Sequence, residues 1–380
     1  MRKTSLMKSI VAGIVAVSSV VVLSACGSTE NTVDTGSTEN EAVIETEEGP
    51  YFSKDATVEE VLTKAAEEEK IGNWGLGDQY GPLALMEKYN LESSFLSQGF
   101  AMDQFDDDTL MVASAMTYNE IGLVVNDYDG AYGYGEDKIG IIDLNKEGVA
   151  VLEDNLVCTK EFAETNPNTV KAFISAAMKG WAYAVENPEE AAQIVYNNGS
   201  SVSPEHQSFM ANEVAKLVST NTRGEKVTEY GILDQESINQ SLDFVQKYVK
   251  LDDNDAAERL AGLTAADICD DSYWVDAMAG NFGTPEKADV SIQLKWLPQS
   301  QFMGYYVAKD MGYFDEVGLN VNIISGGGDI PELTAVNNGS VDFASSWFAA
   351  TVTAKAGGME LIEIAQPYQS AGMTLIYKIN

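Results

Sequence analysis

Three observations lead us to predict an α/β fold from the sequence. Residues 70–125 and 289–378 each alternate short apolar strands, glycine-containing turns and helices, which is typical of α/β units with a mainly parallel sheet. The residues between these two stretches, from about 160 to 280, contain a series of helical segments. The chain beyond residue 50 is long enough for two lobes, and it shows no internal repeat.

In the first stretch, residues 57–67 carry apolar side chains at helical spacing and predict an amphipathic helix. Residues 70–74 predict a short strand that leads into the turn Gly75–Gly81 and then a helix through Lys88. The glycine spacing of this turn matches neither a Walker loop nor the Rossmann fingerprint, so by itself it predicts only a turn. Residues 110–115 predict a buried strand, and residues 118–125 a helix.

The rest of the chain follows with a strand at 155–159 and helices over 170–185, 188–196, 204–217 and 235–248. Residues 281–287 form a turn-rich linker. The α/β pattern then resumes with strands at 290–296, 320–325, 342–345, 360–365 and 373–377, and with helices over 302–311, from about 330, and over 348–356.

The N-terminus has the layout of an export signal. Basic residues in positions 2–8 precede an apolar run from Ile10 to Leu23, which is shorter than the ~20 residues that a membrane span needs. The run ends in Leu23-Ser-Ala-Cys26, which resembles a bacterial lipobox. We therefore expect residues 1–25 to be a lipoprotein signal peptide and Cys26 to receive the lipid that anchors the protein to the cell membrane, on its extracytoplasmic side.

Residues 26–50 are predicted to be an acidic flexible tether, because they hold seven acidic residues, no basic ones and too little apolar surface to offset their ordering entropy. The whole chain has a formal net charge of −36 and a pI near 4.1. Such a surface argues against nucleic acid as a partner, since phosphate backbones are bound by clustered Lys and Arg.

Few residues could carry catalysis or bind metal. Cys158 and Cys269 match no zinc spacing and are expected to be buried and unpaired. The single histidine, His206, is expected in an exposed first helical turn, with no nucleophile elbow to support a catalytic set around it. We therefore predict no metal site, no cofactor and no enzyme activity.

The most specific motif runs from Gln293 to Ala308, and it continues to Phe343. It resembles two-lobed solute receptors of the type II periplasmic-binding fold, which serve ABC importers of thiamine precursors, riboflavin and alkanesulfonates and include the fungal thiamine-pyrimidine synthase. The matching residues are Trp296, Pro298, Gln299, Gln301, Gly304, Tyr306, Val307 and Ala308.

Relatives carry this block just after their signal peptide, whereas here it begins near residue 289. The resemblance therefore implies a circularly permuted chain, with lobe two formed by residues 51–155 and lobe one by residues 156–380. Lobe one would combine the helical part 160–280, the linker 281–288 and the α/β part 289–380. We expect one covalent crossing between the lobes near residues 154–159, with residues 373–377 alongside residues 155–159. The alternative is a truncated or misassembled tandem gene.

Aromatic and amide side chains near turns are the candidate ligand contacts. Flat rings bind between aromatic faces, amides read the edge of a heterocycle, and ligand clefts of open α/β sheets lie beyond the carboxyl ends of strands. The candidates from lobe one are Trp296, Gln299, Gln301, Phe302, Tyr306, Gly327, Gly328, Asp329, Trp347, Gln366, Gln369 and Met373, and those from lobe two are Trp74, Gly75, Tyr80, Tyr118, Asn119 and Glu120.

Two departures from the family bear on function. Gln299 stands where the thiamine-pyrimidine group has Asn, and Phe302 where it has the histidine on which the fungal synthase depends. Without that histidine, the resemblance implies a receptor rather than an enzyme. Such a receptor would be a monomer that hands an aromatic vitamin or precursor, of riboflavin, thiamine or aminopyrimidine type, to an ABC permease. The alternatives are a receptor for a small anion such as an alkanesulfonate, for which the candidate residues are poor in cations, an exported enzyme related to the synthase, and a sensor lobe.

Overall fold

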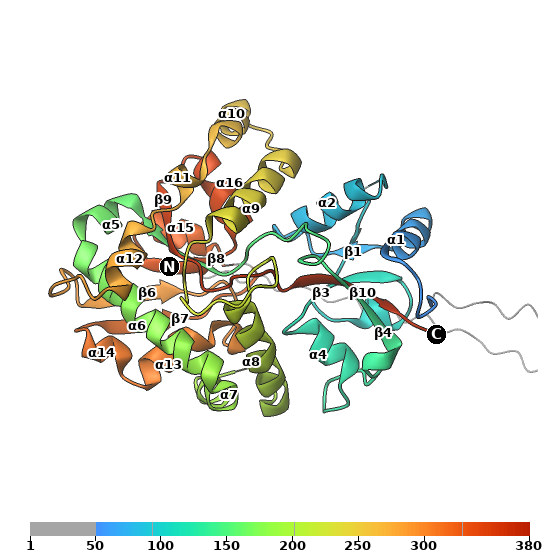
Figure 1. Ribbon diagram of the computed structural model, residues 1–380, viewed down its shortest axis with the longest axis horizontal. Coiled ribbons are helices and arrows are strands. Elements are labelled where there is room, and N and C mark those ends of the chain that lie inside the picture. The colour runs from blue at the N-terminus through green and yellow to red at the C-terminus, as the bar shows by residue number, and fades with distance from the viewer. Residues whose placement is uncertain (1–50, 93, 201, 329) are drawn as a thin grey trace, which may run out of the picture. The chain divides into compact units, whose positions relative to one another are not determined.

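The computed structural model describes residues 51–380 except Ser93, Ser201 and Asp329. The predicted signal peptide, the lipidation site Cys26 and the tether 26–50 lie outside the described residues. Two sheets organise the described chain, and Figure 1 shows helices packed around each of them. We call the part built on the five-stranded sheet the large lobe and the part built on the three-stranded sheet the small lobe.

The five-stranded sheet has the order β7-β6-β8-β5-β9. Its strands are β5 (Asn155–Thr159), β6 (Asp289–Gln293), β7 (Asn320–Ile324), β8 (Phe343–Ser346) and β9 (Leu361–Ala365). β6 pairs in parallel with β7 and β8, as the α/β pattern predicts, whereas β5 runs antiparallel to both of its neighbours. The sheet is therefore mixed rather than mainly parallel.

The three-stranded sheet of the small lobe is antiparallel, with the order β3-β10-β4. Its strands are β3 (Val112–Met116), β4 (Ile139–Asp143) and β10 (Met373–Lys378), and the short parallel pair β1 (Gly72–Asn73) and β2 (Leu96–Ser97) is attached through a bridge from Ile71 to Val112. The last strand of the chain is thus the centre of the small-lobe sheet.

Helices cover both sheets. Those of the small lobe are α1 (Val58–Glu67), α2 (Tyr80–Lys88), α3 (Asp103–Asp106), α4 (Glu120–Val125) and the 3-10 turn η1 (Glu136–Lys138). Those of the large lobe are α5 (Lys160–Thr165), α6 (Pro167–Glu186), α7 (Pro188–Asn197), α8 (Pro204–Ser219), α9 (Gln235–Tyr248), α10 (Asn254–Gly262), α11 (Ala265–Ile268), α12 (Ser272–Met278), the 3-10 turn η2 (Ser300–Phe302), α13 (Met303–Asp310), α14 (Tyr313–Glu316), α15 (Glu332–Asn337) and α16 (Phe348–Ala356).

Local sequence explains several of these boundaries. Thr57 and Glu60 form a capping box that satisfies the free N–H groups at the start of α1. Pro167, Pro188 and Pro204 begin α6, α7 and α8, where their missing N–H and fixed φ are tolerated.

Two chain segments connect the lobes, residues 144–154 from β4 to β5 and residues 366–372 from β9 to β10. The prediction of one crossing was therefore wrong, and residues 373–380 belong to the small lobe rather than to the predicted lobe 156–380. β10 pairs with β3 and β4 and not with β5, so the expected pairing of residues 373–377 with 155–159 is also absent. The difference arises because strand pairing is set by contacts between distant residues, which a local pattern does not contain.

The two connecting segments are tied to each other by hydrogen bonds. The Glu153 carboxylate accepts from the backbone N–H of Gly372 and of Met373, at 3.0 Å in each case. Asn145 donates to the Ala371 carbonyl at 2.9 Å and accepts from the Ala371 N–H at 3.0 Å. The two connecting segments are therefore hydrogen-bonded to each other rather than separate linkers.

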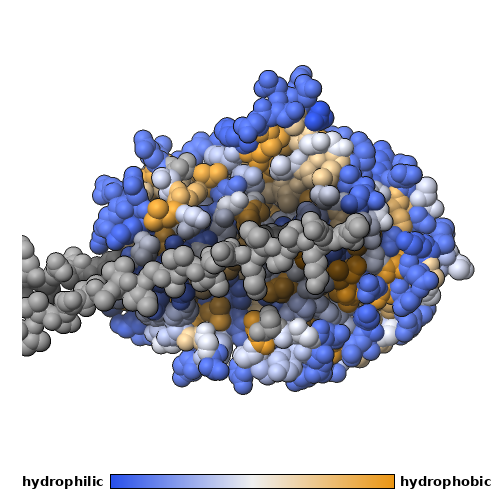
Figure 2. Space-filling model, turned by 180° about the vertical axis from the view of Figure 1, so that it is seen from behind, coloured by the Kyte–Doolittle hydropathy of each residue, from blue (hydrophilic) through white to orange (hydrophobic). Residues whose placement is uncertain are grey.

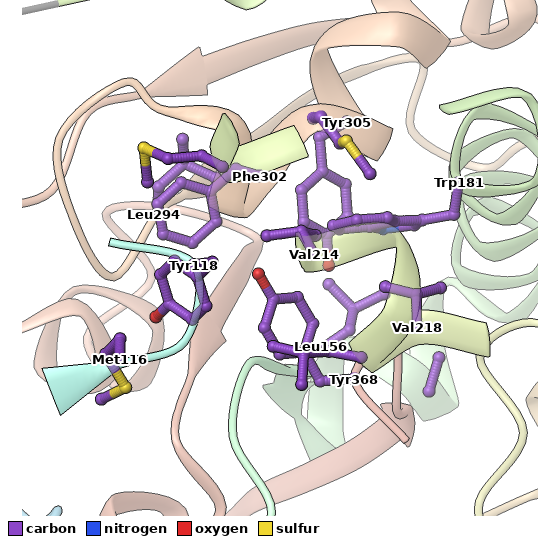
Figure 3. Packing of buried hydrophobic residues seen from close by; sticks show 14 of the residues in the cluster. Met116, Tyr118, Leu156, Trp181, Val214, Val218, Leu294, Phe302, Tyr305 and Tyr368 are labelled. Carbon is purple, nitrogen blue, oxygen red and sulfur yellow. The ribbon is translucent and has the colours of Figure 1, made fainter. Parts of the chain in front are cut away.

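Buried aromatic rings continue the core of the large lobe to the edge of the small lobe (Figure 3). The Trp181 ring meets Tyr368 edge-on with centroids 6.1 Å apart, and Tyr368 in turn meets Tyr118 at 6.0 Å. Two glycines allow the close helix packing beside them. A Cβ added to Gly304 in α13 would lie 2.1 Å from the Trp181 ring, and one added to Gly180 in α6 would lie 2.2 Å from the Gly304 carbonyl oxygen.

The visible surface is mainly hydrophilic with smaller hydrophobic patches between (Figure 2), as the acidic composition predicts. Cys158 and Cys269 are buried free thiols, in agreement with the prediction. In residues 51–380, gaps excepted, no helix has the length and apolar character that crossing a membrane requires.

Candidate functional site

A cavity of about 360 Å³ lies where the two lobes face each other. Ligand pockets are typically concave, largely apolar and ~300–1,000 Å³ in volume, so the cavity can hold a small organic molecule. Its walls come from both lobes and consist of Trp74, Leu76, Phe100, Met116, Tyr118, Asn119, Glu120, Leu123, Val202, Lys295, Trp296, Leu297, Gln299, Gln301 and Trp347.

Aromatic rings from both lobes meet at this cavity. Trp296 follows β6, and its ring lies 5.1 Å from the ring of Phe100 in an edge-to-face arrangement. A Cβ on Gly326 would lie 2.1 Å from the Leu294 carbonyl oxygen, so glycine lets the turn after β7 pack against the segment that carries Trp296. Trp74 is fixed from the small lobe by a hydrogen bond from its indole nitrogen to the Gly99 carbonyl, at 3.0 Å. These rings come from both lobes and provide apolar aromatic surface in the cavity wall.

Two glutamines form a polar row in the large-lobe wall. Gln299 donates to the Gln301 side-chain oxygen at 2.8 Å, and Gln301 donates to both carboxylate oxygens of Asp154, at 3.0 and 2.9 Å. Burial raises the pKa of Asp154 to about 7, and the hydrogen bond from Gln301 opposes that rise. Because these bonds use the Gln301 amide nitrogen, the orientation of both side-chain amides is fixed.

Glu120 is the buried acid of the small-lobe wall. One carboxylate oxygen accepts from the Met116 N–H at 2.9 Å, and the other accepts from the Asn119 amide at 2.7 Å. Burial raises the pKa of Glu120 to about 7, against the effect of these hydrogen bonds. Each carboxylate oxygen has two lone pairs, so Glu120 keeps acceptor capacity toward the cavity.

Lys295 places a cation in the cavity wall, which the sequence reasoning overlooked when it judged the site poor in cations. Its ammonium group is paired with the buried Glu332 carboxylate at 3.0 Å and lies 5.2 Å from the centre of the Trp347 ring. The charge of Lys295 is therefore compensated within the protein.

These structural features agree with what sequence comparison finds. Residues 101–191 and 299–380 match the family described as NMT1/THI5 like. The chain is similar to this family over these two segments. No curated protein sequence matches this chain.

NMT1/THI5-like proteins are mostly extracytoplasmic substrate-binding proteins, and THI5 is an enzyme-like member. The match supports a solute-binding protein or a related family member, and the family implies a small-molecule ligand and a permease as partners. The matched segments contain the cavity residues Tyr118, Asn119 and Glu120 and the two glutamines, but not Trp74 or Trp296.

The structure brings together some of the predicted site residues. Those that line the cavity are Trp74, Tyr118, Asn119, Glu120, Trp296, Gln299, Gln301 and Trp347. They come from segments about 220 residues apart in the sequence and meet because the two lobes face each other.

The other predicted site residues lie elsewhere. Phe302 and Tyr306 point into the core of the large lobe, at 0% and 5% exposure (Figure 3 shows Phe302). The side-chain amides of Gln366 and Gln369 donate hydrogen bonds to backbone carbonyls of the connecting segments and of Ile232. Met373 lies with Trp347 on a separate cavity of about 20 Å³.

The glycines and Tyr80 behave as structural residues. Gly75 and Gly327 have φ values of +76° and +155°, which glycine adopts readily. Gly328 lies beside Trp296, since a Cβ there would be 3.4 Å from its ring, while half-buried Tyr80 packs against a cluster outside the cavity. Asp329 lies outside the described residues.

Several wall residues were not predicted, namely Leu76, Phe100, Met116, Leu123, Val202, Lys295 and Leu297. Lys295 and Leu297 flank Trp296, so their position in the motif was an available signal. The prediction for His206 was wrong, because it is only 1% exposed and joins the two lobes. In residues 51–380, apart from the three gaps, no group of His, Cys, Asp and Glu has the geometry of a metal site.

Proposed function

We propose that this protein is a lipid-anchored extracytoplasmic receptor of an ABC importer, and that it binds a flat aromatic heterocycle between its lobes. The observation that carries the proposal is the cavity of about 360 Å³ with Trp74 on the small-lobe side, Trp296 on the large-lobe side and a fixed row of glutamine amides. Aromatic rings from both lobes suit a planar ligand, and oriented amides suit the polar edge of a heterocycle.

The ligand class follows from the polarity of the walls. An alkanesulfonate receptor needs free cations or N–H donors for the sulfonate, whereas Lys295, the cation among the described wall residues, is already neutralised by Glu332. A ligand of riboflavin, thiamine or aminopyrimidine type fits better, because it combines a ring with donors and acceptors on its edge.

Isothermal titration tests the ligand class directly. The protein is titrated with riboflavin, thiamine, the hydroxymethyl aminopyrimidine precursor of thiamine, and taurine. We expect tight binding of at least one of the three heterocycles and none of taurine. Binding of taurine alone would support the sulfonate receptor instead, and turnover of a bound heterocycle would support the exported-enzyme alternative.

Anchoring and partnership have separate tests. We expect metabolic labelling with a fatty acid to mark the wild-type chain and not the Cys26→Ser variant, which should be released from the membrane. A monomeric mass in size-exclusion chromatography with light scattering, and co-purification with a permease only when ligand is present, are the outcomes expected of an importer receptor.

We also propose that the family segments are circularly permuted, with two crossings between the lobes rather than the single one expected and with residues 373–377 in the small-lobe sheet instead of beside residues 155–159. Phe52 donates a backbone hydrogen bond to Lys378 at 2.9 Å and accepts one from Asn380 at 3.0 Å, so these two parts of the chain lie where a direct connection could join them. The linker 281–288 is fixed to the large lobe by Glu286, which accepts a hydrogen bond from the backbone N–H of Thr169 at 2.9 Å. A rearranged chain that begins at residue 289, joins residue 380 to residue 51 by a short linker and ends at residue 281 should keep the wild-type circular dichroism and ligand affinity. Failure of this chain to fold would count against the permutation.

A further inference from the structure

The only histidine of the chain forms a hydrogen-bonded bridge between the lobes beside the cavity. His206 lies in the first turn of α8, where the Ser203 hydroxyl accepts its backbone N–H at 3.2 Å. Across the lobe boundary, its Nε2 lies 2.8 Å from the Asn119 side-chain oxygen, and its Nδ1 is hydrogen-bonded to the Tyr128 hydroxyl. The Phe209 ring stacks beside it, with an interplanar angle of 12°.

The partners determine which nitrogen carries the proton. The Asn119 oxygen can only accept, so His206 Nε2 is the donor, and Nδ1 is left to accept from the Tyr128 hydroxyl. Burial lowers the pKa of His206 to about 4, so the ring is neutral at ordinary pH and both of its nitrogens are satisfied. The titratable groups that face it are Tyr128 directly and Glu120 through Asn119.

The bridge continues into the cavity wall. With its oxygen held by His206, Asn119 turns its amide nitrogen toward Glu120, to which it donates at 2.7 Å. Glu120 also accepts from the Met116 N–H at 2.9 Å, so both oxygens are fixed as acceptors. Above its pKa of about 7, where Glu120 is ionised, its remaining lone pairs at the cavity can only receive a hydrogen bond from a bound molecule.

We propose that His206 is a positioning residue that acts through Asn119 on Glu120, so that the closed cavity selects heterocycles with an N–H donor edge over isosteres that lack one. This inference rests on the proposed function, which places a flat heterocycle in this cavity. It adds the polarity of the edge that faces the small lobe, and it gives a role to a residue that does not itself line the cavity.

Two pyrimidines of nearly equal shape test the inference. 4-Amino-2-methylpyrimidine carries an N–H donor edge, and 4-methoxy-2-methylpyrimidine has only acceptors at the same edge. Binding to the full chain in detergent is followed by tryptophan fluorescence, since Trp74, Trp296 and Trp347 line the cavity. At a pH about two units above 7, where Glu120 is ionised, a hydrogen bond to this charged acceptor should give the wild-type protein a preference for the amino compound of about tenfold or more.

The variants separate positioning from packing. His206→Asn shortens the side chain so that it no longer reaches Asn119, whereas His206→Gln carries an amide N–H near the position of Nε2. We expect His206→Asn to reduce the preference to about twofold or less and His206→Gln to retain most of it. Melting curves of both variants establish that they are folded at the assay temperature.

Each outcome decides the matter. A preference that stays at the wild-type value in His206→Asn refutes the positioning role, as does an equal weakening of both compounds in both variants, which indicates a contact that only closes the lobes. If the wild-type protein binds neither pyrimidine nor any of riboflavin, thiamine and the thiamine precursor, the proposed function fails, and this inference fails with it. If it binds both pyrimidines equally, only the inference fails.

Discussion

The buried Glu363 makes the stability of the large lobe depend on pH in a way that one substitution should remove. Glu363 lies in β9, the edge strand of the five-stranded sheet, and has no exposed surface. One carboxylate oxygen accepts from the Asn155 amide at 2.9 Å, while the other has no hydrogen-bond partner among the described residues. Burial raises the pKa of this carboxyl from 4.5 to about 8.

The sign and size of this pH effect on the free energy of unfolding follow from proton linkage. Between pH 4.5 and about 8 the folded protein holds a proton on Glu363 that the unfolded chain has released, so the free energy of unfolding falls as the pH rises. At ~1.36 kcal/mol for each pH unit in that interval, the total loss is about 5 kcal/mol. Glu363→Gln keeps the shape and an oxygen for Asn155 but cannot ionise, so it should abolish this loss.

The assay is urea unfolding of the wild-type protein and of Glu363→Gln, followed by circular dichroism at pH 5, 6, 7, 8 and 9. The stability difference in favour of the variant should grow by several kcal/mol across the series and level off above pH 8. Glu360→Gln, on an exposed residue of the same segment, is the matched control and should follow the wild-type protein within ~0.5 kcal/mol. A difference between Glu363→Gln and wild type that is constant from pH 5 to pH 9 would refute the reasoning.

Three further changes test other parts of the structure. Gly304→Ala forces a methyl group to within 2.1 Å of the Trp181 ring and should lower the free energy of unfolding by ~3 kcal/mol in urea titrations, whereas Gly262→Ala, with open space around it, should change it by less than ~1 kcal/mol. Trp296→Ala should weaken heterocycle binding about tenfold or more in calorimetry with an unchanged circular dichroism spectrum, and unaltered affinity would show that the ligand binds elsewhere. Because burial lowers the pKa of His206 from 6.5 to about 4, the unfolded chain takes up a proton first as the pH falls through this interval, which costs about 3 kcal/mol. His206→Phe should therefore make the unfolding free energy less sensitive to acid between pH 6.5 and pH 4, and an unchanged pH dependence would contradict the lowered pKa.

Local patterns predicted the elements of this protein better than their pairing. The helix over Pro188–Asn197 and the strand Asn155–Thr159 agree with expectation because apolar periodicity and helix-starting residues are properties of neighbouring residues. β4 was missed and β10 was assigned to the other lobe, because the partner of a strand is chosen by packing between residues far apart in the sequence.

The candidate site shows the same division. Trp296 and Gln299 were predicted from a motif whose spacing places them after a strand, and they lie in the cavity wall. Phe302 belongs to the same motif but faces the core, because it follows the wall residue Gln301 in the 3-10 turn η2, where one residue rotates a side chain by about 120°. The role of His206 was beyond the reach of sequence reasoning, since its burial depends on the approach of a lobe encoded almost ninety residues earlier.

The bonds between the two connecting segments also bear on the mechanics of the molecule. If the connecting segments 144–154 and 366–372 were not bonded to each other, the lobes could slide, twist and bend relative to each other with similar ease. Glu153 is hydrogen-bonded to the backbone of Gly372 and Met373, and Asn145 to that of Ala371. Sliding one connecting segment past the other would therefore stretch several hydrogen bonds at once. Bending across the pair preserves all of them. The softest deformation of this protein should therefore be rotation about a single axis, with shear and torsion much stiffer.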